Sequence, residues 1–329
     1  MRRREFVTLL GVAAAFPAAA WAQANKDVRR VTVLLGLREN PISHVYLGIF
    51  KSELQRLGWV DGQNLKIDLR FATNDPAKIK ASAADLMKDP PDVFLALSTL
   101  EVRALLDQTH TIPIVFTMVT DSVGAGFAQT VAYPGGSVTG FENFDPSLGG
   151  KWVELLREIA PASTTLAIVF DNAKAVYTSR FLRSVEDAAS GLSMRVTRIE
   201  LKDPAVAAKT LEDFAAVERG VLVVLPSQAA STNGEMIVAA ASRHKLPAIY
   251  PLRTFIVPRG GLLSYGVNMN DQFRRGAEYV DRILRGESPA TLPVQAPTKY
   301  ELVVNLRAAK AQGINIPTTI LTSADEVIE

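Results

Sequence analysis

The sequence contains no cysteine among its 329 residues. Disulfide bonds, thiolate metal sites and cysteine nucleophiles are therefore excluded. A lipid anchor of the bacterial lipoprotein type is excluded as well, because that anchor is built on a cysteine. Histidine is nearly as scarce, and the three that occur, His44, His110 and His244, lie far apart along the chain. Nothing in the sequence supports a metal site.

Motifs of common enzymes are also missing. Gly149-Gly-Lys151 resembles the end of a phosphate-binding loop, but Trp152 stands where Ser or Thr must hold Mg²⁺. Ser242 and Lys245 have the spacing of a β-lactamase nucleophile without the companion motifs of that family. Neither a Gly-x-Ser-x-Gly turn nor a His-Glu-x-x-His helix occurs. We therefore expect no enzymatic activity and no cofactor.

Neither sign of charge is in excess. The 36 Lys and Arg residues are balanced by 34 Asp and Glu residues, and no basic block follows Arg29-Arg30. A chain of this kind is not predicted to bind nucleic acid or a charged membrane surface. Any ligand must be recognised by local groups, because bulk charge provides no steering.

The first 24 residues have the pattern of a signal peptide. Basic residues 2–4 precede the apolar run 7–20, and Ala22-Gln-Ala24 supplies the small residues that a signal peptidase requires. The run is shorter than the roughly 20 residues of a membrane span. Residues 3–7 also resemble the twin-arginine export pattern, although Sec signals carry arginines here too. We expect cleavage near Ala24 and a periplasmic protein.

Short apolar runs alternate with amphipathic stretches from residue 30 onward. Residues 31–35, 93–97, 114–119, 166–170 and 221–225 have the composition of buried strands, with helical patterns between them. This order predicts an α/β fold of mostly parallel sheets flanked by helices. The pattern restarts after residue 146, and roughly 300 mature residues exceed one hydrophobic core. Two lobes are therefore expected.

Polar residues follow most of the predicted strands. Ligands of such sheets bind beyond the carboxyl ends of the strands, where loops meet helix N-termini. Ser98 and Thr99 either cap the next helix or, with Thr120, bind a carboxylate. Asp121 either holds its own loop or pairs with a ligand ammonium. The candidate ligand-binding residues are Ser98, Thr99, Thr120, Asp121, Asn172, Tyr177, Ser227, Tyr250 and Asn268.

Several segments spread over the whole mature chain resemble one family. These segments are residues 112–116 (Ile-Pro-Ile-Val-Phe), 120–123 (Thr-Asp-Ser-Val), 134–141 (Pro-Gly-Gly-Ser-Val-Thr-Gly-Phe), 148–152, 246–250, 260–266, 292–300 and 323–329. They are similar to the bacterial ABC-transporter substrate-binding proteins of the tryptophan/tyrosine transport type. Thr99 and Asp121 fall where relatives commonly have Thr and Asp. Ser98, Leu100 and Ser122 depart from the pattern.

The resemblance implies the class I periplasmic-binding-protein fold, with two lobes, three interlobe crossings and closure on a ligand. In that topology residues 25–143 and 269–290 form the N-terminal lobe, and residues 144–268 and 291–329 form the C-terminal lobe. The resemblance also implies a permease and an ATPase in the inner membrane as partners.

We therefore expect a monomeric periplasmic solute-binding protein. It would capture a small molecule between its lobes, with an aromatic or related amino acid as one ligand class, and deliver it to an ABC importer. A ligand sensor that presents its state to a membrane receptor is the alternative on the same fold. A periplasmic enzyme is the rival from another class, and it would need titratable residues clustered at the cleft.

Overall fold

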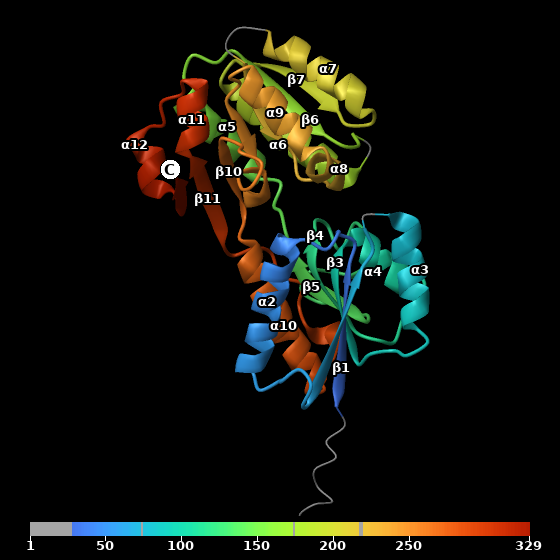
Figure 1. The fold of residues 1–329 in the computed structure, drawn as a ribbon. Helices are drawn as coiled ribbons and strands as arrows, with labels where there is room; N and C mark the ends of the chain where they lie inside the picture. Colours follow the sequence, from blue (N-terminus) through green and yellow to red (C-terminus); the bar gives the residue numbers. More distant parts are fainter. Residues whose placement is uncertain (1–27, 74, 174, 217–219) are drawn as a thin grey trace, which may run out of the picture.

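The computed structural model describes residues 28–73, 75–173, 175–216 and 220–329. The predicted signal peptide lies outside the described residues. Two β-sheets, each flanked by helices, form two lobes that are joined by several chain segments (Figure 1). The α/β architecture of mostly parallel, helix-flanked sheets predicted from the sequence is confirmed.

The sheet of the first lobe has five parallel strands in the order β2-β1-β3-β4-β5. Its central strands are continuous apolar runs because helices cover both faces. The strands are β1 (Arg29–Leu35), β2 (Leu65–Phe71), β3 (Val93–Ser98), β4 (Ile114–Val119) and β5 (Val138–Glu142).

The sheet of the second lobe has seven strands in the order β12-β11-β10-β9-β8-β6-β7. All neighbours pair in parallel except β10 and β11, which are antiparallel. The strands are β6 (Thr165–Phe170), β7 (Arg195–Glu200), β8 (Gly220–Val224), β9 (Ala248–Tyr250), β10 (Leu263–Val267), β11 (Tyr300–Asn305) and β12 (Glu326–Ile328).

Helices cover both faces of the first sheet. One face packs on α3 (Pro76–Leu86) and α4 (Thr99–Leu106) through a core that includes Phe94 and Phe116. The other face packs on α2 (Pro41–Arg56) and α10 (Met269–Leu284). Because α10 comes after most of the second lobe in the sequence, the first lobe is completed by a distant segment (Figure 1).

The second sheet is covered in the same way. On one face lie α5 (Leu148–Ile159) and α6 (Val176–Gly191), and their core is continuous with the α2–α10 core of the first lobe. On the other face lie α7 and α9, with α8 beside them. The remaining helices are α7 (Pro204–Ala215), α8 (Gln228–Thr232), α9 (Gly234–Arg243), α11 (Leu306–Gln312), α12 (Thr318–Ser323) and the short 3₁₀ turns η1 (Arg253–Phe255) and η2 (Pro289–Thr291).

The chain passes between the lobes after β5, after β10 and before β11. Residues 291–295 pack on the first lobe, since Gln295 pairs with Phe141 and the Val294 N–H donates to the Val131 carbonyl at 2.8 Å. The division into lobes remains our proposal, and we place its last crossing after Gln295 instead of at residue 290.

No helix in the described part of the chain is both long enough and apolar enough to cross a membrane.

Candidate functional site

An ion pair joins a loop at the strand ends of the first lobe to a helix of the second lobe. Asp121 follows β4 in the first lobe, and Arg180 lies in α6 of the second lobe. Arg180 Nη1 is 3.8 Å from Asp121 Oδ2. The carboxyl end of β4 therefore faces α6 across the space between the lobes, where a ligand of this fold would bind.

Asp121 holds its own loop, one of the two roles considered from its sequence position, and its other carboxylate oxygen faces the second lobe. Its Oδ1 accepts a hydrogen bond from the Gly124 N–H at 2.7 Å, which holds the loop after β4. Its Oδ2 faces Arg180. The Asp121 side chain is 19% exposed, so it is shielded on most sides and remains open toward the other lobe.

Ser98 caps α4, and its hydroxyl is already engaged. The Ser98 Oγ–H donates to Glu101 Oε2, and the Ser98 N–H donates to the same oxygen at 3.0 Å. Glu101 Oε1 accepts from the Gly36 N–H in the loop after β1. Glu101 is 2% exposed, and burial raises its pKa above the ordinary value while these hydrogen bonds oppose the shift. Glu101 thus fixes two loops of the candidate site relative to each other.

Thr99 and Thr120 remain available to a ligand by position. Both are partly exposed, at the start of α4 and directly after β4. Next to Thr120, Ser122 donates through its N–H at 2.8 Å and its Oγ at 2.7 Å to Glu142 Oε1 at the end of β5. Glu142 therefore fixes the loop that carries Thr120 and Asp121.

In the second lobe, Asp171 organises the loop between β6 and α6. Its carboxylate accepts from the Tyr177 hydroxyl at 2.8 Å, from Thr178 Oγ1 at 3.2 Å and from the Asn172 N–H at 2.7 Å. Burial and the Asp171 charge together raise the pKa of Tyr177, which stays a neutral donor. The side chain of Asn172 is exposed at the rim of the loop.

The hydroxyl of Ser227 caps α8 by accepting from the Ala230 N–H at 3.0 Å. An accepting hydroxyl can still donate its own hydrogen, so Ser227 stays in the candidate site.

Tyr250 is withdrawn from the candidate site. Its side chain is 1% exposed and stacks on Phe255 with ring centroids 5.2 Å apart, inside the core of the second lobe. Because β9 is a central strand covered on both faces, its last residue points into the core and not toward the other lobe.

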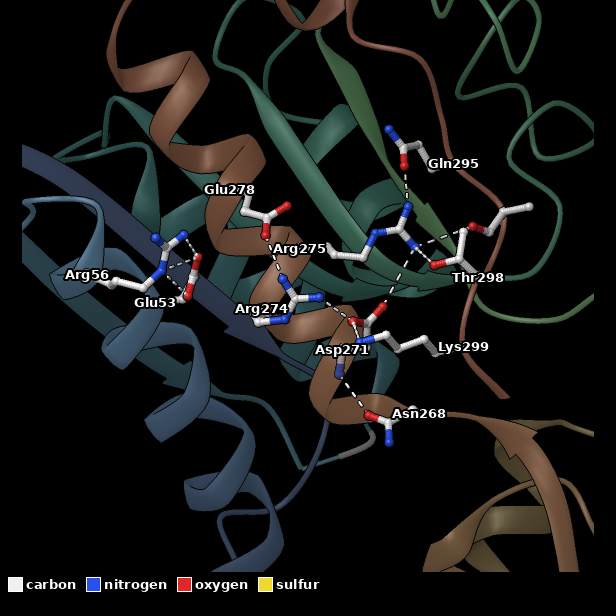
Figure 2. A network of polar contacts seen from close by, with 11 residues as sticks. Glu53, Arg56, Asn268, Asp271, Arg274, Arg275, Glu278, Gln295, Thr298 and Lys299 are labelled. Carbon is white, nitrogen blue, oxygen red and sulfur yellow. Dashed lines mark hydrogen bonds and ion pairs between the residues drawn. The ribbon is translucent and has the colours of Figure 1, made fainter. Parts of the chain in front are cut away.

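Asn268 lies at the second crossing and joins it to the third. Its Oδ1 accepts from the Asp271 N–H at 2.9 Å and so caps α10, while its Nδ2 donates to Glu301 Oε2 in β11 at 2.7 Å. Figure 2 shows the polar network that continues from this cap along α10. Asp271 lies 3.4 Å from Lys299 Nζ and 3.9 Å from Arg275 Nη1, and it also pairs with Arg274.

Glu301 carries the most strongly shifted carboxyl pKa at these crossings. The pKa of Glu301 is raised to about 7, chiefly by burial and also by the charges of Glu326 and Asp325, while Arg253 and the Asn268 hydrogen bond oppose the shift. Arg253 is held by Glu326 through two hydrogen bonds of 2.6 Å each, which leaves Glu301 only part of its charge.

This shift predicts how stability depends on pH. The folded protein binds the Glu301 proton more tightly than the unfolded chain does. Glu301 therefore lowers the free energy of unfolding increasingly as pH rises from about 4.5 to about 7. Glu301→Gln keeps the acceptor for Asn268 and should stabilise the protein by about 1–2 kcal/mol at pH 8 after discounting for solvent screening. Thermal melts should show this gain vanish near pH 4.5; an equal gain at both pH values would contradict the assignment.

Two cavities in the structure are lined by none of the candidate ligand-binding residues. One, of about 480 Å³, is lined by residues that include Trp59, Asn64 and Arg285 and lies at the end of the first lobe opposite the carboxyl ends of its strands. The other, of about 500 Å³, runs along β7 and α7. In the part of the chain that the structure describes, no group of three or more His, Asp or Glu residues is placed to hold a metal ion.

Some residues of the site were missed in the sequence. Glu101 had a visible signal, because Ser98 and Glu101 have the spacing of a capping box. Glu142 and Arg180 had none, because their partners lie 20 and 59 positions away.

Two α/β lobes joined by several crossings, with the loop after β4 facing α6 between them, define a class I periplasmic-binding-protein architecture. Residues 30–328 match the family of the ABC transporter substrate binding proteins. The chain belongs to this family.

Individual relatives agree with this assignment. A tyrosine-binding protein of Clostridioides difficile is 25% identical over 280 residues, which cover 84% of this chain and 80% of the relative. The structure of a conserved domain protein from Vibrio cholerae matches with a TM-score of 0.80 at 28% identity, over 91% of this chain and 99% of that chain. A structure from Streptococcus pneumoniae in complex with L-Trp matches with the same TM-score and coverage at 22% identity.

Proposed function

We propose that this substrate-binding protein captures an amino acid, aromatic or related, between its lobes. The observation that carries the proposal is Asp121, a shielded carboxylate in the loop after β4 that faces the other lobe. Such a carboxylate is suited to a ligand ammonium, because charge-assisted hydrogen bonds are strong where water is excluded. The tyrosine-binding relative and the L-Trp complex support the same ligand class.

The proposed ligand-binding residues come from both lobes. Thr99, Thr120 and Asp121 of the first lobe would contact the amino acid head group, with Asn172, Tyr177 and Ser227 of the second lobe and Asn268 of the hinge opposite them. Ligand contacts to both lobes favour the closed state over the open one, so binding and a hinge motion are coupled. Ser98 serves as a cap that supports Thr99.

We further propose that the protein is a periplasmic monomer without enzymatic activity. It would leave the cytoplasm by means of residues 1–24, start at Asn25 after cleavage, and deliver its ligand to the permease and ATPase of an ABC importer. N-terminal sequencing of periplasmic protein tests the cleavage; a chain that still begins at Met1 would contradict it.

Binding assays with purified protein test the ligand class. Ligand that copurifies is first identified by native mass spectrometry and then removed by unfolding and refolding. Calorimetry with L-tyrosine and L-tryptophan should give saturable binding, and small-angle scattering should show a smaller radius of gyration in the complex. A sugar alcohol serves as the control that lacks both charges. Binding of the sugar alcohol but of no amino acid would refute the proposal.

A further inference from the structure

Arg180 is the cationic group opposite the proposed ammonium site. It lies near the N-terminal end of α6, which begins at Val176. Its side chain is 53% exposed, and its Nη1 is 3.8 Å from Asp121 Oδ2. Among the ion pairs formed by described residues, this pair alone joins the two lobes without involving a crossing segment.

The arginine of this pair is half exposed and lies 3.8 Å from Asp121, so the pair is easily exchanged for other contacts. An ion pair with one partner open to water contributes little, on the order of 1 kcal/mol or less, because water solvates the exposed partner almost as well. The Arg180 guanidinium can therefore turn to a ligand at little cost. Since it presents two N–H groups in a plane, it can bind a carboxylate through two parallel hydrogen bonds.

The other groups predicted to bind a carboxylate are weaker candidates. The Ser98 hydroxyl donates to Glu101 and has no hydrogen left for a ligand. Thr99 and Thr120 each offer one neutral donor. A carboxylate that is enclosed between two lobes needs a compensating positive charge, because an unpaired charge is costly away from water.

We propose that Arg180 binds the carboxylate of the ligand while Asp121 binds its ammonium, so that a zwitterionic α-amino acid replaces the Asp121–Arg180 ion pair on closure. This inference rests on the proposed function and narrows it. An amine would leave Arg180 without a partner, and a carboxylic acid would leave Asp121 without one. The two charges together select for compounds that carry both groups.

Calorimetry with variants and truncated ligands tests the assignment. Arg180→Gln should weaken the binding of L-tyrosine or L-tryptophan about 10- to 150-fold, as expected for a lost hydrogen bond to a charged group. Arg180→Lys should restore part of the affinity, because it keeps the charge. Arg183→Gln is the matched control, since Arg183 is an exposed arginine of the same helix, and it should bind like the wild type. Tyramine and tryptamine, which lack the carboxylate, should bind Arg180→Gln at least as tightly as the wild type, because the variant no longer leaves a cation without a partner.

The outcomes separate this inference from the proposed function. If the wild type binds L-tyrosine or L-tryptophan and Arg180→Gln binds it as tightly as Arg183→Gln does, the role of Arg180 is refuted and the amino acid proposal stands. The role of Arg180 is also refuted if Arg180→Lys loses as much affinity as Arg180→Gln, or if Arg180→Gln loses as much affinity for tyramine as for the amino acid. If the wild type binds no amino acid, both proposals fail together.

Discussion

Trp152→Ala is expected to lower the free energy of unfolding of the second lobe by about 4 kcal/mol, within the range for a buried Trp or Phe replaced by Ala. Trp152 is fully buried on α5, and its ring stacks on Phe181 of α6 with centroids 5.7 Å apart. Its Nε1–H donates to the Tyr265 carbonyl in β10 at 2.7 Å. The substitution leaves a cavity between these helices and the sheet and also removes the partner of that carbonyl.

Urea unfolding followed by two probes measures the effect. The mature chain has two tryptophans, Trp59 in the first lobe and Trp152 in the second, so the fluorescence of Trp152→Ala reports on the first lobe alone. Circular dichroism should show the second lobe unfolding at lower urea. Trp152→Phe is the control that keeps the stacking but loses the hydrogen bond, and it should cost about 1–3 kcal/mol. If Trp152→Ala is as stable as Trp152→Phe, the cavity left by the alanine does not contribute to the loss of stability.

The second large effect is expected for Asp271→Asn at the start of α10. The Asp271 side chain is 6% exposed and lies against Arg274, Arg275 and Lys299 (Figure 2). Removing one partner of a buried ion pair costs about 3–5 kcal/mol. We expect about 3 kcal/mol, because Arg275 keeps Gln295, Thr298 and the Ala296 carbonyl as acceptors.

The same substitution should also loosen the hinge. Asp271 connects the second crossing, through the Asn268 cap, to Lys299 of the third crossing. Thermal melts give the stability, and scattering of the ligand-free protein gives the spread of lobe distances, which should widen. Glu278→Gln is the control on the same helix; its half-exposed pair with Arg274 should contribute less than about 1 kcal/mol. Equal effects of the two variants would mean that the network does not act through the crossings.

Most of the fold was predictable because each buried strand of a parallel sheet is a short continuous apolar run. The strand Ile114–Val119 begins and ends where the sequence predicts, and β3 and β6 each differ from the predicted strands 93–97 and 166–170 by a single residue at one end. β5 was not predicted as a strand, because Gly140 lies within it. A Cβ on Gly140 would lie 2.1 Å from the Phe116 carbonyl oxygen, so glycine is required by the close approach of β4 and not by a turn.

The site was less predictable than the fold, and the reason is physical. Polar residues follow the strands of a parallel sheet, and their positions can be inferred from the sequence around each strand. Whether each hydroxyl is used by the protein itself depends on neighbours: Glu101 engages Ser98, and Asp171 engages Tyr177. Tyr250 was misassigned because the polarity of its hydroxyl suggested exposure, whereas the packing of its ring decides its position. Arg180 could be recognised as a residue of the site only once the arrangement of the two lobes was known.

The interleaved order of the elements has a consequence for biosynthesis. The first sheet is complete once residue 142 has been made, but α10, which ends at Leu284, covers one of its faces. The second sheet gains its last strand only with residues 326–328. At about 5–20 residues per second, a ribosome needs about 7 to 28 s to synthesise the residues between the end of the first sheet and the end of α10. A nascent chain therefore stays incompletely folded until translation is nearly finished: a Sec translocase could engage it during that interval, whereas twin-arginine export would have to wait for termination and folding.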